Sequence, residues 1–150
     1  MMRVVTFIFL FLSFLFSAKL EVTADKFNID HKKRVTIFQG SVTVVQGKDE
    51  IKSENIYVFT DEKNKPIRFE AIEDVKFVIQ AGKKQYLGKC DSLVYQPLKD
   101  EYTLFGDVKV NQSDNSEVLM GEKIVINQKT KKAEVVGGEK PVKLIFGSDD

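Results

Sequence analysis

Residues 91–106 read DSLVYQPLKDEYTLFG and run directly into DVKV at 107–110. An acid opens this unit, an alternating apolar stretch follows, a polar turn interrupts it, and a second alternating stretch ends at Gly106. The same order recurs at 25–40 (DKFNIDHKKRVTIFQG, followed by SVTV) and at 122–137 (EKIVINQKTKKAEVVG). In all three copies the closing glycine stands 15 positions after the acid. Repetition of this kind predicts a stack of similar hairpins that share one core.

A looser fourth copy occupies residues 54–73, where the turn is longer (TDEKNKP) and Glu73 replaces the glycine. Throughout residues 20–146 apolar residues recur with a period of two, and the helical period is absent. Turn signals such as GKDE at 47–50 and NQSDNS at 111–116 separate the stretches, and Pro66 is expected in a polar loop. Many short strands with frequent turns predict an all-β sandwich, roll or barrel.

Overlaying the copies predicts which side chains face inward. The positions two and four after each opening acid, and two and four after each closing residue, are apolar in every copy, with an insertion at 138–141 in the last one. Alternate residues of a strand share a face, so these side chains should line one apolar trough. They are Phe27, Ile29, Val42, Val44, Ile56, Val58, Val75, Phe77, Leu93, Tyr95, Val108, Val110, Ile124 and Ile126.

Composition limits the classes of function. The chain has 150 residues, of which 43% are hydrophobic and 30% are charged, which fits one globular domain. Its formal net charge is +1, which argues against non-specific nucleic-acid binding, because that requires a basic surplus. The single cysteine excludes an intramolecular disulfide, and the single histidine excludes the usual histidine-rich metal sites.

The first 18 residues, MMRVVTFIFLFLSFLFSA, have the composition of a secretory signal peptide. Arg3 supplies the positive start, and an apolar run of 13 residues follows at 4–16. Such a run spans only about 20 Å as a helix, which is shorter than the ~30 Å hydrocarbon core of a bilayer. We expect cleavage near Ala18, leaving a domain at 19–150 outside the cytoplasm. An uncleaved membrane anchor is the alternative.

Residues that could carry chemistry have simpler positional explanations. Cys90 precedes an opening acid at a position where the other copies have Ala24, Ser53 and Gly121, so the position requires a small residue. His31 lies in the basic turn HKKR at 31–34; a solvated hairpin tip is expected there, and a phosphate-binding patch shared with 129–132 is the functional alternative.

The opening acids of the four copies are Asp25, Glu54, Asp91 and Glu122. Because they occupy equivalent positions in successive repeats, they should form a row along the stack and not converge on one reacting centre. The sequence also contains no phosphate-cradling loop, metal motif or nucleophile elbow. We therefore expect neither an enzyme nor a cofactor or metal.

Four segments carry a resemblance to a known family. ADKFNI at 24–29, FQGSVTV at 38–44, LFGDVKV at 104–110 and GEKIVIN at 121–127 resemble, in order and spacing, the OstA-type family of periplasmic lipopolysaccharide transport proteins. The resemblance covers essentially all of residues 20–146. It implies a β-jellyroll, a slightly open and twisted sandwich whose apolar groove holds the acyl chains of lipid A.

The resemblance also implies partners and a location. Family members join head to tail through edge strands in the periplasm and bridge inner-membrane and outer-membrane components of the lipopolysaccharide export machinery. In this chain the edge positions would be Leu20, Val22, Ala24, Val142, Leu144 and Phe146. Two alternatives remain: a membrane-anchored OstA-like component of the same pathway, and a structural β-scaffold with a closed interior and no ligand.

Overall fold

The computed structural model describes residues 20–81, 83–113 and 117–145, so the expected signal peptide and Phe146 lie outside the described residues. Every regular element in this part is a strand, which confirms the all-β prediction. The described residues contain no helix long and apolar enough to cross a membrane. The strands are β1 (Leu20–Thr23), β2 (Lys26–Asp30), β3 (Val35–Gln46), β4 (Asp49–Thr60), β5 (Pro66–Ala81), β6 (Lys84–Gln96), β7 (Glu101–Gln112), β8 (Val118–Asn127), β9 (Lys132–Val136) and β10 (Lys143–Ile145).

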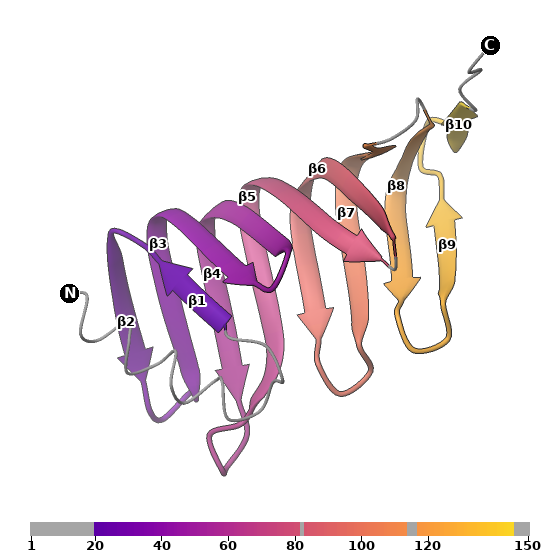
Figure 1. Ribbon diagram of the computed structural model, residues 1–150. Coiled ribbons are helices and arrows are strands. Elements are labelled where there is room, and N and C mark those ends of the chain that lie inside the picture. Colours follow the sequence, from indigo (N-terminus) through magenta and orange to yellow (C-terminus); the bar gives the residue numbers. More distant parts are fainter. Residues whose placement is uncertain (1–19, 82, 114–116, 146–150) are drawn as a thin grey trace.

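These strands form one antiparallel sheet in which neighbours in sequence pair, except at the two ends. At one end β1 and β2 both pair with β3, and at the other end β9 and β10 both pair with β8 (Figure 1). The long strands β3 to β8 each supply two segments, because the pairing register shifts in the middle of every pair. The sheet is thereby divided into two layers along its length.

We call the part next to the hairpin tips the first layer; it contains β2, β9 and residues 35–39, 55–60, 66–72, 92–96, 101–105 and 123–127. The second layer contains β1, β10 and residues 42–46, 49–53, 75–81, 84–90, 108–112 and 118–121. The tips of the first layer are the lower loops in Figure 1.

In β3, β5 and β7 the chain passes between the layers through pairs of residues with positive φ. These pairs are Gly40 and Ser41 in β3, Glu73 and Asp74 in β5, and Gly106 and Asp107 in β7. The φ of Gly106 is 81° and that of Glu73 is 73°, so the second copy keeps the same bend although it lacks the glycine. Left-handed backbone is easy for glycine and strained for glutamate.

The bend also explains the spacing of 15 between acid and glycine. A Cβ placed on Gly40 would lie 2.5 Å from Asp25 Oδ2, and one placed on Gly106 would lie 2.7 Å from the Cβ of Asp91. Asp25 and Asp91 therefore each pack the side chain onto the closing glycine of their own unit. The last copy differs, because Glu122 lies against Gly138 and not against Gly137.

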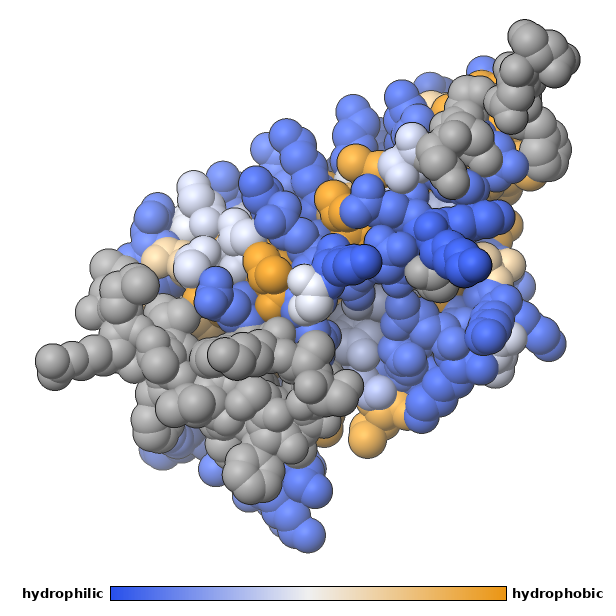
Figure 2. All heavy atoms as spheres, in the orientation of Figure 1, coloured by the Kyte–Doolittle hydropathy of each residue, from blue (hydrophilic) through white to orange (hydrophobic). Residues whose placement is uncertain are grey.

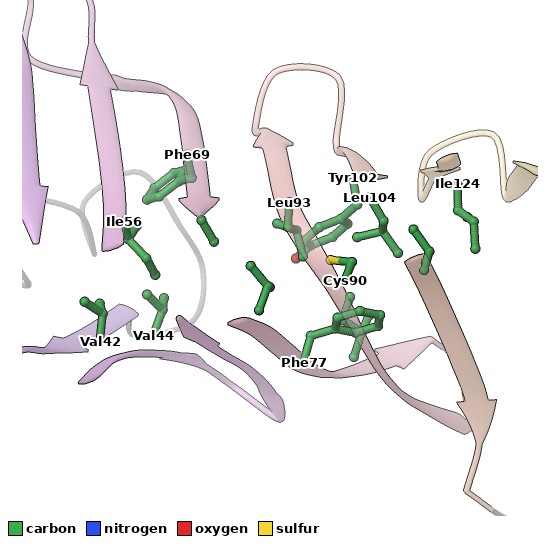
Figure 3. Packing of buried hydrophobic residues seen from close by; sticks show 14 of the residues in the cluster. Val42, Val44, Ile56, Phe69, Phe77, Cys90, Leu93, Tyr102, Leu104 and Ile124 are labelled. Atoms are coloured by element: carbon green, nitrogen blue, oxygen red, sulfur yellow. The ribbon is translucent and has the colours of Figure 1, made fainter. Parts of the chain in front are cut away.

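The core lies between the layers. Figure 3 shows Val42, Val44 and Phe77 of the second layer facing side chains of the first layer that include Ile56 and Leu93. The fully buried side chains are Phe38, Leu93, Leu104, Ile124, Val42, Val75 and Val108. The face seen in Figure 2 is mostly hydrophilic with scattered apolar groups, as expected of a sheet whose other face is buried.

Asx turns shape the hairpin tips. In an Asx turn the side-chain oxygen of an Asp or Asn accepts hydrogen bonds from the backbone N–H groups of residues that follow it. Asp30 Oδ1 accepts from Lys32 and Lys33 at 3.0 Å each, and Asp61 and Asn127 act in the same way in their tips. The expectation for Pro66 was wrong, because it is the first residue of β5 and not part of the loop. A strand start tolerates proline because its missing N–H is not needed there.

Candidate functional site: the interior between the layers

The fourteen side chains expected to face inward are placed as follows. Ten belong to the buried core, and Phe27, Tyr95 and Ile126 are partly buried and pack against it. The exception is Ile29, which is 47% exposed. Ile29 is in β2, at the end of the sheet, where no further strand of the described chain covers it.

A small cavity of about 40 Å³ lies between the two layers. Its volume would hold a few water molecules and is far below the ~300 Å³ at which ligand pockets usually begin. Side chains of both layers line it: Val44, Gln46, Asp49 and Ile51 from the second layer, and Ile56, Phe69, Ala71, Leu93, Tyr95 and Tyr102 from the first. The interior is therefore apolar and nearly closed in this structure.

Three aromatic rings form one wall of the cavity. Phe69, Tyr95 and Tyr102 stand directly opposite one another on β5, β6 and β7. The ring centroids are 6.0 Å apart for Phe69 and Tyr95 and 4.5 Å apart for Tyr95 and Tyr102. Burial is the main cause that raises the pKa of both tyrosines, so their hydroxyls stay neutral. The Tyr95 hydroxyl donates to Asp100 Oδ1 at 3.2 Å, which turns it toward the hairpin tip.

One carboxylate lines the cavity opposite these rings. Asp49 begins β4, and its Oδ1 accepts a bond of 2.8 Å from the backbone N–H of Gln80. Burial raises the pKa of Asp49, and the bond from Gln80 opposes part of that rise. The charged form of Asp49 is thus disfavoured beside the aromatic wall.

The residues expected to face inward did not include six that line the cavity: Gln46, Asp49, Ile51, Phe69, Ala71 and Tyr102. A usable signal existed for two of them. Tyr102 precedes Leu104 by two positions, and Phe69 precedes Ala71 by two, so the alternation extends backward toward the hairpin tips.

The other candidates lie away from the cavity. Cys90 is buried, its thiol donates to the carbonyl of Ser92 at 3.2 Å, and burial raises its pKa to about 12, so it stays a neutral thiol. A nucleophilic cysteine needs the thiolate. His31 lies in an exposed tip at 31–34. Among the residues that the structure describes, no three His, Cys, Asp or Glu side chains are grouped to hold a metal ion.

Of the expected edge positions, Leu20 and Val22 lie on β1 and Leu144 lies on β10, whereas Ala24 and Val142 lie just outside these strands. β1 and β10 each have a single neighbour, β3 and β8 respectively. Val22 of β1 is buried and Ala24, which follows β1, is partly buried, whereas Val142 is 40% exposed and Leu144 of β10 is 50% exposed. Among residues 20–81, 83–113 and 117–145, each end of the second layer is thus a strand with a neighbour on one side, and such an edge presents unpaired backbone groups.

Comparisons with known proteins add two findings. The family model described as "LptA/(LptD N-terminal domain) LPS transport protein" matches residues 21–132. LptH from Pseudomonas aeruginosa, described as the LptA-homologous periplasmic component of the lipopolysaccharide transport device, has a solved structure that superposes with a TM-score of 0.75. The match covers 86% of this chain and 95% of that one at 18% identity, so it shows a shared fold. No curated protein matches the sequence.

Proposed function

We propose, because this chain belongs to the LptA/(LptD N-terminal domain) family of lipopolysaccharide transport proteins, that it shields lipid acyl chains during export. In this proposal the domain acts in the periplasm after its leader is removed. It binds the lipid A acyl chains without chemistry and bridges inner-membrane and outer-membrane components.

The observation that carries the proposal is the apolar interior between the two layers. Val, Ile, Leu and Phe side chains from both layers line it continuously across the sheet. Each methylene removed from water gains about 0.8 kcal/mol, so a multi-chain lipid needs such a surface to cross an aqueous space. At the cavity, the aromatic wall formed by Phe69, Tyr95 and Tyr102 would offer an apolar surface to an acyl chain.

The small volume of the cavity sets a condition on this function. An acyl chain cannot enter about 40 Å³, so the layers must separate to admit one. Strand pairing runs within each layer, and the layers meet through side chains and through the bends of β3 to β8. Separation would therefore exchange side-chain contacts for contacts with lipid and leave the strand hydrogen bonds intact.

Bridging is supported by the two ends of the sheet. The single-sided strands β1 and β2 lie at one end and β9 and β10 at the other, which suits head-to-tail strand addition. In this arrangement the interior of one copy would abut the interior of the next. The membrane-anchored alternative uses the same domain with residues 1–18 retained.

A closed scaffold is the second candidate, and the near-complete burial of the interior favours it. Side chains such as Phe38, Leu104 and Val75 have 0% exposure, which is the packing of an ordinary core. In that case the interior would hold no ligand.

Photocrosslinking separates the two candidates. A photoreactive amino acid at Tyr95, beside the cavity, should crosslink to lipopolysaccharide in the protein isolated from the cell envelope. The matched control is the same photoreactive amino acid at Asn28, which should not crosslink to lipopolysaccharide. Asn28 lies opposite Ile37 of β3, which in turn lies opposite Tyr57 of β4, and this row of residues faces away from the interior. Crosslinks confined to Asn28 would exclude a lipid-binding interior. No crosslink at either position, with no lipid in the native mass spectrum, would support the scaffold.

A further inference from the structure

A row of lysines runs across the outer face of the second layer. Lys52 stands opposite Lys76, Lys76 opposite Lys89, and Lys89 opposite Lys109, on the adjacent strands β4 to β7. Adjacent strands are about 4.8 Å apart, so the four Cα atoms span about 14 Å. Four ammonium groups thus extend from one straight line of positions.

Neither the net charge of the chain nor ion pairs within it explain this row of lysines. The whole chain carries a formal net charge of only +1. Like charges directly opposite in a sheet are destabilising. In the part of the chain that the structure describes, the ion pairs are Lys52 with Glu50 at 3.9 Å and Arg68 with Glu70, so Lys76, Lys89 and Lys109 have no ionic partner there.

The lysines surround a shallow concavity of about 570 Å³. This volume lies within the usual range for ligand pockets, in contrast to the interior cavity. Besides the four lysines, its lining includes Glu50, Asn111, Val78 and Leu87. Leu87 is 39% exposed, so an apolar surface lies next to the charged row.

From this lining we propose that the concavity binds a phosphorylated sugar. Lysine ammoniums bind phosphate groups through charge-assisted hydrogen bonds. The amide of Asn111 and the carboxylate of Glu50 can bond to sugar hydroxyls, and Val78 with Leu87 offers a surface for the C–H face of a ring. The inference does not depend on the proposed lipid function of the interior.

Acidic residues beside the row of lysines disfavour a flat anionic membrane as the partner. Each lysine has an acid two positions nearer the bend of its own strand: Glu54, Asp74, Asp91 and Asp107. Two strand residues span about 7 Å, which is inside the ~8 Å Debye length at physiological salt. A flat surface would therefore meet both signs of charge together, whereas a small ligand in the concavity contacts the ammonium groups directly.

The test is calorimetric titration of the full chain with a hexose bisphosphate, with free hexose, pyrophosphate and phosphatidylglycerol vesicles as separate arms. We expect the bisphosphate to bind, the affinity to fall as salt rises, and the double change Lys76→Gln/Lys89→Gln to weaken binding at least tenfold. The matched control Lys26→Gln/Lys132→Gln removes the same charge from exposed positions on β2 and β9 and should bind as the wild type does.

Thermal unfolding separates a binding role from a structural one. Removing two like charges from the row should leave the melting temperature equal or higher. A lower melting temperature would assign the lysines to stability and overturn the proposal. Three further results would also overturn the proposal. The first is equal binding of pyrophosphate and the bisphosphate, and the second is lysine-dependent binding of the vesicles without binding of the bisphosphate. The third is unchanged binding in the Lys76→Gln/Lys89→Gln variant. Crosslinking at Tyr95 should be the same in all these variants.

Discussion

Gly106→Ala should destabilise the fold by about 1–4.5 kcal/mol, because two separate effects act at this bend. The φ of Gly106 is 81°, a conformation that costs a non-glycine residue about 1–2 kcal/mol. The new Cβ would also lie 2.7 Å from the Cβ of Asp91, and overpacking of this kind costs about 1–3 kcal/mol. The reduced entropy of the unfolded chain offsets about 0.4–1 kcal/mol.

Gly47→Ala is the matched control, since it isolates the backbone effect. Gly47 has a φ of 60° in the exposed turn between β3 and β4, and a Cβ there would meet nothing within 4 Å. Urea unfolding followed by circular dichroism gives both free energies, provided that the m-values agree. Adding Asp91→Gly to Gly106→Ala should recover the part of the loss that is due to crowding. Equal losses for Gly106→Ala and Gly47→Ala, or no coupling to Asp91, would refute the acid-on-glycine account of the repeat.

The second copy allows the reverse substitution. Glu73 has a φ of 73° although it is not a glycine. The Ser53 hydroxyl donates a hydrogen bond of 3.2 Å to the Glu73 backbone carbonyl. Glu73→Gly should therefore relieve strain and stabilise the fold by about 0.5–1 kcal/mol after the entropy cost of glycine. Destabilisation would show that the Glu73 side chain contributes contacts that outweigh the strain.

Two further predictions concern the cavity and the sheet edge. Burial raises the folded pKa of Asp49, so the folded state binds more protons than the unfolded state between the ordinary pKa and the raised one, and stability is lost as pH rises through that window. Asp49→Asn keeps an oxygen for the Gln80 N–H and should be more stable than the wild type above the window; equal stability at all pH values would contradict this. Leu144→Lys on β10 should shift concentration-dependent oligomers toward monomer in sedimentation experiments without lowering the melting temperature, and undiminished association would exclude this edge.

Much of the fold followed from the repeat, because the period-2 pattern and the 15-residue spacing are both local in sequence. Val42, Leu93, Val108 and Ile124 are apolar at equivalent positions, and all four are at most 1% exposed. The strand register carries this pattern across the whole sheet. The lipid-binding role of these residues remains a prediction, which the crosslinking at Tyr95 tests.

The cavity could not be predicted in the same way, because it depends on how the two layers face one another. Asp49 follows a turn and looks like a solvated acid in the sequence, yet its carboxylate bonds to the Gln80 backbone and faces the aromatic wall. Nothing in the local pattern around Asp49 indicates which layer lies opposite. The shift of the last acid from Gly137 to Gly138 has a similar cause, because the inserted residues 138–141 change the path after β9.

The register also explains why apolar side chains are exposed at the two ends. Ile29 belongs to the inward row of the first layer that continues through Val58, Phe69 and Tyr95. Leu144 pairs with Leu119 and extends the inward row of the second layer that contains Phe77. Each is exposed because the stack ends there, at 47% and 50%, and a repeat array normally ends in polar caps. Within residues 20–145 as described, neither end carries such a cap over these rows. A further copy added at either end would cover an inward row and extend the interior, so under the proposed head-to-tail association the repeat that builds the core would also provide the surface for assembly.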